Sequence, residues 1–370
     1  MVTAVEDVDV LVVGLGAMGS AALYHLALAG AEPVGLDQYA VGHDRGSSHG
    51  RSRVFRLAYP KPDYVGLARA ALPLWRALEE RSGARLLTLC GMVSYARPGN
   101  AEFERILATL DECGVAHDRI DSAGVCEQFP MLRIPPDAQA YFSPEAGFLD
   151  AGRCVRTHVE QALGAGARVV EHARVTSTQL RADRPVVTTT SGRYRCRRLV
   201  LAPGPWAGEL RLPITVTRQQ KFYFSTAHPE RYGPDRLCVY SDYDALIYGF
   251  PHYGPGLKVA DDHVGEVTSP GTIDRSLDDA ERDRLRAWLA ALMPELGPTP
   301  VEGATCMYSL TPDRDFLLGP HPDNPAVLVA AGFSGHGYKF ATLVGRILAD
   351  LAADGSTPYP IERFRLDRFA

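Results

Sequence analysis

DVLVVGLGAMGSAALYHLALAG, residues 9–30, is the stretch that decides the fold of this 370-residue chain. It opens with a β-branched run typical of a strand buried on both faces, and it closes with an Ala- and Leu-rich helical run. Between the two, Gly14, Gly16 and Gly19 have the G-x-G-x-x-G spacing. Such glycines permit a tight turn, let a pyrophosphate approach the backbone, and let the helix pack closely on the strand. The stretch therefore predicts a strand–turn–helix unit that binds a dinucleotide, either FAD or NAD.

The residues that follow support the same interpretation. A second strand-like run at residues 33–36 ends in Asp37, eighteen positions after Gly19, where an acidic residue can bind ribose hydroxyls. We expect the N-terminus of the helix to face the phosphates with unpaired N–H groups and a partial positive charge. The alternative, a membrane anchor or signal peptide, is disfavoured by the three glycines and by the acidic residues Glu6, Asp7 and Asp9.

Composition excludes several functional classes. A net charge of −5 and the lack of a basic tract argue against a nucleic-acid partner, and no segment predicts a membrane partner. The seven cysteines form no C-x-x-C pair, so neither a zinc site nor a disulfide framework is indicated, and we expect no metal. The length suggests about two domains, and the cysteine usage suggests a cytoplasmic location.

A polar loop, GHDRGSSHGRSR at residues 42–53, follows Asp37 and should lie near the bound cofactor. Its cationic and hydrogen-bonding residues could hold a diphosphate, a flavin edge or an anionic substrate, although Arg53 and Arg56 could also be a solvated surface pair. The serines of this loop lack the strand–elbow–helix context of a hydrolase nucleophile.

The remaining elements alternate between helices and strands. A helix over residues 63–82 should be kinked or interrupted by Pro73. Asp150 is a plausible N-cap for a helix through Leu163. Strand-like runs are expected at residues 86–96, 168–171, 174–179, 186–190, 198–202 and 326–331. An amphipathic helix is expected around residues 103–110, antiparallel strands and a helix within 213–303, and a final helix over 341–352.

These elements predict an α/β (α+β) fold. We expect a Rossmann-like FAD-binding domain made of residues 1–85, 147–212 and 305–370, and a discontinuous antiparallel-sheet substrate domain made of residues 86–146 and 213–304.

Six motifs in order along nearly the whole chain resemble the monomeric sarcosine oxidase and N-methyl-amino-acid oxidase family, within the glycine-oxidase-like FAD amine oxidases. They are GLGAMG at 14–19, HGRSRVFR at 49–56, YGFP at 248–251, GLK at 256–258, CMYSLTPD at 306–313 and GFSGHGYKF at 332–340. The resemblance implies FAD as the cofactor, a small amine and dioxygen as the reactants, and a monomer.

The resemblance also implies roles for single residues. Cys306 matches the cysteine bonded to the flavin 8α-methyl carbon, although a lone cysteine is more often a small buried residue. Lys258 matches the lysine beside which oxygen is reduced, unless it is an exposed strand lysine. Arg56 and Lys339 match the pair that binds the substrate carboxylate.

Two further groups of residues are implied. Tyr248 and Tyr308 match tyrosines that border the substrate pocket, and His49 and Arg53 match active-site residues of the loop, so the catalytic set is Lys258, His49, Arg53, Tyr248 and Tyr308. The cofactor-binding set is Gly14, Gly16, Ala17, Met18, Gly19, Asp37, Ser48, His49, Ser52, Arg53, Val175, Gly204, Cys306, Gly335, His336, Gly337 and Lys339.

The chain also departs from the family. Gly50-Arg51-Ser52-Arg53 stands where the family has Gly-Asp-Thr-Arg, which adds a cation. The histidine expected a few positions after the lysine aligns with either Asp262 or His263. Because pocket residues choose the substrate, these changes leave its identity open.

The implied reaction is the oxidation of a secondary amine beside a carboxylate, giving an imine and hydrogen peroxide. An acyclic imine hydrolyses to an aldehyde and a primary amine. The alternatives are oxidation of a cyclic imino acid or a glycated amino acid in a biosynthetic pathway, a dehydrogenase that passes electrons to a carrier, and a flavin-binding subunit without turnover.

Overall fold

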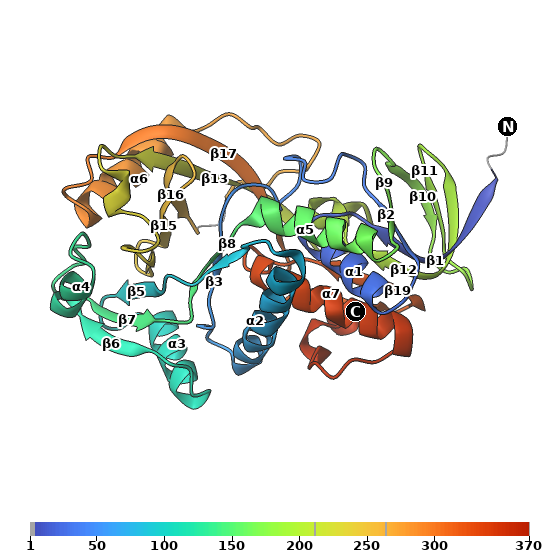
Figure 1. Ribbon diagram of the computed structural model, residues 1–370, viewed down its shortest axis with the longest axis horizontal. Helices are drawn as coiled ribbons and strands as arrows, with labels where there is room; N and C mark the ends of the chain where they lie inside the picture. The colour runs from blue at the N-terminus through green and yellow to red at the C-terminus, as the bar shows by residue number, and fades with distance from the viewer. Residues whose placement is uncertain (1–3, 211, 263–264, 370) are drawn as a thin grey trace.

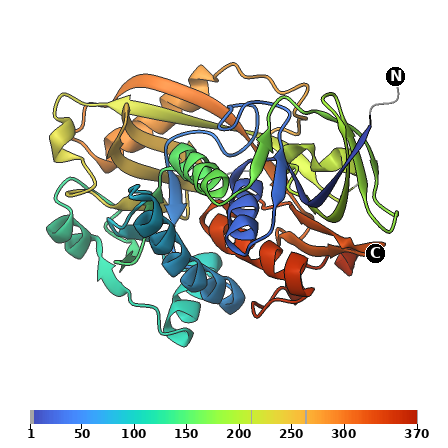
Figure 2. The same ribbon diagram turned by 45° about the vertical axis from the view of Figure 1, so that its right-hand side comes forward.

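Two eight-stranded sheets organise the computed structural model, which describes residues 4–210, 212–262 and 265–369. The first sheet lies on the right in Figure 1 and the second on the left, and Figure 2 keeps the same arrangement after a 45° turn. A three-stranded sheet, formed by β3 (Arg53–Phe55), β8 (Gly147–Leu149) and β4 (Leu87–Thr88), completes the sheets of the described residues.

The first sheet begins with the strand of the glycine motif. β1 (Val5–Val13) pairs in parallel with β2 (Pro33–Leu36) and with β12 (Arg193–Leu201), so segments far apart in sequence flank it. β2 pairs in parallel with β9 (Arg168–Val170), and β12 pairs in parallel with β19 (Asn324–Ala331). Antiparallel strands extend the sheet at its margins, namely β10 (Val175–Gln179), β11 (Val186–Thr189) and β18 (Leu317–His321).

Helices cover the parallel strands. α1 (Ala17–Leu28) packs against α5 (Ala151–Gly164) and α7 (Ala341–Asp354), and α7 also contacts α2 (Pro62–Ser82). α1 is buried along nearly its whole length, which explains why its sequence is apolar on all sides. A Cβ on Gly19 would lie 1.7 Å from the carbonyl oxygen of Gly14, so only glycine lets this helix follow the turn so closely.

The second sheet is antiparallel except where β5 and β14 pair in parallel. Its order is β17 (Thr299–Leu310), β13 (Thr215–Ser225), β16 (Gly256–Asp261), β15 (Ile247–Tyr253), β14 (Val239–Asp242), β5 (Met92–Ala96), β7 (Gln139–Ser143) and β6 (Asp118–Asp121). α6 (Asp279–Leu292) and α4 (Ser122–Gln128) place leucine and valine side chains in its core, and α3 (Ala101–Glu112) also packs on it, where the ring centroid of Phe103 lies 5.3 Å from that of Tyr141 on β7.

This architecture confirms the predicted fold class. The N-cap prediction at Asp150 is also confirmed, because its Oδ1 accepts a hydrogen bond of 3.0 Å from the N–H of Arg153. The two-domain division remains a proposal, and β17 crosses its boundary at residues 304 and 305. The elements β6, α4, β7 and β8 were not among the sequence predictions.

Of the two outcomes predicted for Pro73, the interruption is wrong, because α2 runs through it as one helix of 21 residues, and the kink stays a prediction. Pro73 lies on the exposed side of α2, where water can bind the carbonyl that loses its N–H partner. Trp75 and Leu78, which are buried, hold the second half of the helix against the core.

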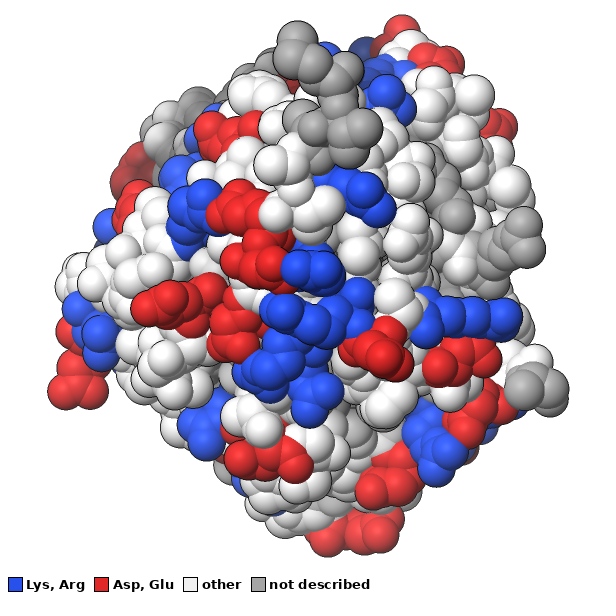
Figure 3. Space-filling view, turned by 90° about the vertical axis from the view of Figure 1, so that its right-hand side faces the viewer, with Lys and Arg blue, Asp and Glu red and all other residues white. Residues whose placement is uncertain are grey.

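Two observations concern the surface. Figure 3 shows acidic side chains beside the arginines on the face that carries β10–β12, and ion pairs join Arg195 and Arg184 to Asp7 and join Arg197 to Asp9. No helix among the described residues has both the length and the apolar character to cross a membrane.

Candidate cofactor and substrate site

Two adjoining cavities lie where the two sheets meet. The first has a volume of about 740 Å³ and follows the glycine turn, and the second has a volume of about 620 Å³ and reaches the strands of the second sheet. Both are lined by Gly16, Ser47, Ser48, Ala202, Gly204 and Lys221. The cavities therefore form one elongated space with a shared middle section.

The glycine turn forms one wall of the first cavity. Gly14 has a φ of +89°, and a Cβ there would lie 2.3 Å from the carbonyl oxygen of Ala202. A Cβ on Gly16 would lie 2.9 Å from Ser48 Oγ, so this wall is a cradle that side chains would fill. The expectation of unpaired N–H groups is wrong for Ala17, because its N–H donates to Ser48 Oγ at 2.9 Å. The loop therefore caps the start of α1.

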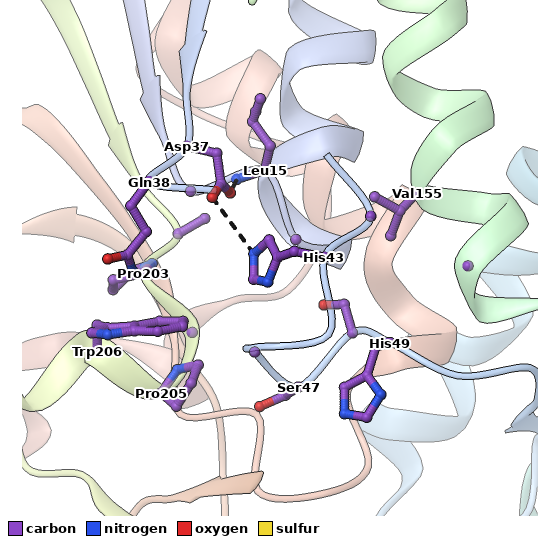
Figure 4. Close-up of a pocket in the computed structure, with 18 of the residues that line it drawn as sticks. Leu15, Asp37, Gln38, His43, Ser47, His49, Val155, Pro203, Pro205 and Trp206 are labelled. Atoms are coloured by element: carbon purple, nitrogen blue, oxygen red, sulfur yellow. Dashed lines mark hydrogen bonds and ion pairs between the residues drawn. The ribbon is translucent and has the colours of Figure 1, made fainter. Parts of the chain in front are cut away.

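Asp37 marks the far end of the first cavity. Its Oδ2 accepts from the N–H of Leu15 at 2.8 Å, and its Oδ1 lies 3.5 Å from His43 Nε2 (Figure 4). The His43 ring centroid lies 6.5 Å from that of Trp206. Sequence analysis missed these two aromatic residues, although His43 lies in the polar loop and Trp206 follows the turn after a predicted strand.

Three buried polar atoms here have no hydrogen-bond partner: Ser47 Oγ and Lys221 Nζ in the middle section, and His49 Nε2 in the first cavity. Burying a polar atom without a partner is unfavourable, so these atoms favour a bound polar ligand. Burial, together with the charges of Lys221 and Arg53, lowers the pKa of His49 to about 3. His49 is therefore a neutral group here.

Arg53 organises the loop around this section. Its guanidinium donates to the carbonyl oxygens of Ser52 and Ser47 at 3.0 Å each and to that of His49 at 2.6 Å. The predicted surface pair of Arg53 and Arg56 is not observed, since Arg53 is half-buried in these bonds and Arg56 lines the second cavity.

Two cations share an aromatic ring in the second cavity. Arg56 Cζ and Lys339 Nζ lie 5.3 Å and 5.1 Å from the ring centroid of Tyr59. Lys339 Nζ donates to Tyr59 Oη at 2.7 Å, and Arg56 Nη1 donates to Tyr243 Oη at 2.8 Å. Neither cation forms an ion pair with a carboxylate within the described ranges. Burial and the charge of Arg56 lower the pKa of Lys339 well below its usual value, so an anion bound here would be strongly favoured.

Lys258 lies on β16 in the same cavity. Its Nζ donates to the carbonyl oxygen of Ser52 at 2.9 Å and lies 4.4 Å from the ring centroid of Phe250. Burial, with the charges of Arg53 and Lys221, lowers its pKa well below the usual value. A negative charge nearby would restore the ammonium form.

Cys306, Tyr308 and Tyr248 also line this cavity. Cys306 lies on β17 opposite Gln219 of β13, and it is a partly exposed free thiol. Burial and the neighbouring Tyr248 raise the pKa of Tyr308 well above its usual value, so this hydroxyl stays protonated.

An acidic wall completes the cavity. Asp262 and Glu102 line it. Burial by the surrounding protein raises the pKa of Asp262, while the charges of Arg56 and Lys339 lower it. His263, the other candidate for this position, lies outside the described residues.

The Gly-rich turn before α7 supplies Lys339. Gly335 has a φ of +82°, and a Cβ there would lie 2.6 Å from Tyr308 Cε2. Burial and the charge of Lys339 lower the pKa of His336 to about 3, and its ring packs 4.8 Å from that of Phe316. The turn passes through a short 3₁₀ segment (Tyr338–Phe340), and α7 itself begins at Ala341.

The structure brings nearly all of the predicted site residues to these two cavities. The residues that line them are Gly14, Gly16, Ala17, Met18, Asp37, Ser48, His49, Arg53, Arg56, Val175, Gly204, Tyr248, Lys258, Cys306, Tyr308, Gly335, His336, Gly337 and Lys339. Gly19 and Ser52 do not line them: Gly19 allows the close packing of α1, and Ser52 offers its carbonyl oxygen to Lys258. Within the described part of the chain, no three His, Cys, Asp or Glu side chains are grouped as metal ligands.

Lys221, Tyr59 and Tyr243 were not predicted from the sequence either. The alternation of Gln219, Lys221 and Tyr223 along β13 places these three on one face, but the sequence does not reveal that this face meets a cavity. Tyr59 and Tyr243 belong to segments that come together only in the folded chain.

Known proteins resemble this chain along its whole length. The family described as "FAD dependent oxidoreductase" matches residues 9–351. Monomeric sarcosine oxidase of Streptomyces avermitilis is 36% identical over 375 residues, which cover 98% of each chain. N-methyl-L-tryptophan oxidase of Yersinia pestis is 28% identical, and the match covers 98% of this chain and 100% of the Yersinia protein. The structure of NikD, an unusual amino acid oxidase essential for nikkomycin biosynthesis, superimposes with a TM-score of 0.86, 28% identity and 98% coverage of both chains.

Proposed function

The chain belongs to the FAD-dependent oxidoreductases, in the branch of monomeric sarcosine and N-methyl-amino-acid oxidases, and from this premise we propose that it oxidises a secondary amine that carries a carboxylate. It is an FAD-dependent oxidase acting on a CH–NH group. The proposed products are an imine and hydrogen peroxide, and an acyclic imine then hydrolyses to an aldehyde and a primary amine.

One observation supports the carboxylate part of this proposal most strongly. Lys339 is buried and Arg56 is partly buried beside one cavity, and neither cation forms an ion pair within the described ranges. A guanidinium can bind a carboxylate through two parallel hydrogen bonds, and an ammonium adds a point charge. Tyr59 and Tyr243 hold the two cations in place, so that little order is lost when the anion binds.

The acidic wall suits the other end of the substrate. Asp262 lines the cavity. A substrate amine that arrives as an ammonium must first lose a proton, because a neutral amine is the form that is readily oxidised. The site therefore needs a proton acceptor near the amine. Asp262 would take that proton, and its raised pKa makes it a better proton acceptor than an ordinary carboxylate. Tyr248 and Tyr308 would exclude water from the amine-bearing carbon.

The two cavities fit FAD. The glycine cradle and Asp37 suit the adenosine diphosphate half, and the unpaired Ser47 and His49 atoms suit polar groups nearer the ring. When bound there, FAD supplies a hydride acceptor for the amine and passes the electrons to dioxygen. We propose that Cys306 holds it covalently through the 8α carbon and that Lys258 provides the positive charge that favours oxygen reduction.

A second candidate substrate class is a cyclic imino acid. Its carboxylate would bind Arg56 and Lys339 in the same way, and NikD, which this chain resembles, is an unusual amino acid oxidase essential for nikkomycin biosynthesis. We also propose that the chain acts as a monomer in the cytoplasm, which its mass in solution and its cellular fractionation would test.

Peroxide release from a panel of substrates tests the proposal. Sarcosine, N-methyl amino acids, cyclic imino acids and glycated amino acids are compared with matched amines that lack the carboxylate. We expect peroxide to form much faster from members with a carboxylate than from the matched amines. Equal rates with and without the carboxylate would contradict the proposal, and so would a lack of peroxide from every member while FAD is bound.

A further inference from the structure

Lys221 is a buried lysine for which the proposed reaction has no use. It lies on β13, its side chain is only 3% exposed, and its Nζ has no hydrogen-bond partner. A Cβ on Gly50 would lie 2.7 Å from this Nζ, so the lysine reaches across to the polar loop. Lys221 lines both cavities and therefore stands at their shared middle section.

Cys306 is close to Lys221 through strand pairing. In the β13–β17 ladder Gln219 is opposite Cys306, and Lys221 is opposite Ala304. Lys221 and Cys306 thus occupy diagonal positions on one face of the sheet, about 7–8 Å apart between backbones and within reach of a long side chain. The two groups also interact electrostatically, because a Cys306 thiolate raises the pKa of Lys221.

We propose that Lys221 accepts the thiol proton of Cys306 when the bond between that sulfur and FAD forms. This inference rests on the covalent attachment proposed above. The thiolate is the nucleophilic form of cysteine, so a neighbouring proton acceptor speeds its reaction. After the transfer, the ammonium of Lys221 stands beside the thiolate and stabilises it until the sulfur–carbon bond forms.

The step balances with dioxygen as the oxidant, which is the co-substrate of the proposed oxidase. The sulfur–hydrogen bond and one carbon–hydrogen bond of the 8α-methyl group break, and one sulfur–carbon bond forms. The hydrogen on sulfur leaves as a proton to Lys221 Nζ. Two electrons and two protons leave in total, and dioxygen takes them as hydrogen peroxide.

The other basic side chains near Cys306 suit this task less well. Lys258 is a weaker base, because burial and the charges of Arg53 and Lys221 lower its pKa well below the usual value. His49 has a pKa of about 3 and is too weak a base for a thiol, whereas burial, with the charge of Arg53, lowers the pKa of Lys221 to about 8. An amine of that pKa is partly neutral near neutral pH and can receive a proton.

The test measures covalent attachment and not turnover. Freshly purified full-length protein is incubated with excess FAD in air, and samples are precipitated with acid over time. The flavin that stays in the pellet is covalently bound, and total bound flavin is read before precipitation. Lys221→Met, Lys221→Arg and the control Lys61→Met are compared, since Lys61 lines the second cavity but pairs with Asp315.

We expect Lys221→Met to bind FAD normally and to attach it at least about tenfold more slowly than the natural chain, with the Lys61→Met control unchanged. Lys221→Arg should also attach FAD slowly. A guanidinium keeps the positive charge, but it stays fully protonated and therefore cannot accept the thiol proton. Raising the pH toward 9.5 should speed attachment in both Lys221 variants, since hydroxide can then replace Lys221 as the proton acceptor.

Three outcomes would overturn the inference. The first is attachment of FAD by Lys221→Met at the natural rate. The second is attachment at the natural rate by Lys221→Arg, which would assign a purely electrostatic role to Lys221. The third is loss of FAD binding in Lys221→Met. Failure of the underlying proposal looks different: the natural chain would then release all its flavin into the acid supernatant, whatever residue stands at position 221.

Discussion

Replacing Arg56 by methionine should weaken catalysis only for substrates that carry a carboxylate. Methionine keeps much of the length and apolar volume of the side chain and removes the guanidinium beside Tyr59 and Tyr243. Hydrogen bonds to charged groups contribute about 1.5–3 kcal/mol each, and a guanidinium can offer two of them to one carboxylate. Lys339 remains in the cavity and retains part of the attraction.

The expected loss is therefore about 3 kcal/mol of transition-state binding, or roughly 150-fold in kcat/KM. The assay is a two-by-two comparison of the natural chain and Arg56→Met, each with an amino acid substrate and with the matching amine that lacks the carboxylate. The amine should be a poor substrate for both proteins, with rates within about threefold of each other. Arg56→Lys should fall between, because it keeps the charge and loses the paired geometry.

Lys61→Met serves as the matched control, since it removes a cation from the wall of the same cavity without touching Tyr59 or Tyr243. Its kcat/KM should stay within about twofold of the natural value. The reasoning would be refuted if Arg56→Met lost equal activity toward both substrates, or if the control lost as much as Arg56→Met.

Three further predictions concern other parts of the site and the fold. Lys258→Met should slow air reoxidation of the reduced enzyme by about 100-fold, because a fixed positive charge near the reacting oxygen contributes about 3 kcal/mol. Anaerobic reduction by substrate should stay nearly unchanged. Equal slowing of both half-reactions in stopped-flow absorbance would contradict this role. Cys306→Ser should still bind FAD but release all of it into the acid supernatant, and flavin retained in the pellet would assign the bond to another residue. His25 is buried against Thr342, and burial lowers its pKa to about 3, so this residue resists protonation in the folded chain. Its contribution to the free energy of unfolding is therefore full above pH 6.5 and falls as the pH drops from 6.5 toward 3. At pH 5 the loss from this one group is about 2 kcal/mol, and His25→Asn should show a correspondingly smaller fall in free energy of unfolding between pH 7 and pH 5 in urea titrations; an unchanged fall would show that His25 is not a source of it.

Local patterns in the sequence predicted the nucleotide-binding half of the fold well. The glycine spacing and the strand that ends in Asp37 act within about thirty residues, so neighbouring residues decide the outcome. The N-cap at Asp150 is equally local. Pro73 was misjudged because the cost of a proline depends on which side of the helix is exposed, and that is a tertiary property.

The sequence predicted those site residues that lie within recognisable motifs. Cys306, Lys258 and Lys339 were identified through resemblance, since each sits in a recognisable run of residues. Lys221 was not, because both faces of β13 are covered and the sequence alone cannot assign a lysine to one of them. Asp262 was left open against His263 because the family's histidine is expected a few positions after the lysine, and both residues fall there.

A crystal structure of the chain with FAD and a carboxylate inhibitor tests the central claim most directly. The account predicts inhibitor carboxylate oxygens within hydrogen-bonding distance of both Arg56 and Lys339, with the flavin ring bonded to Cys306 Sγ and Lys258 Nζ facing that ring. An inhibitor carboxylate bound away from both cations, or a flavin ring out of reach of Cys306 and Lys258, would contradict it.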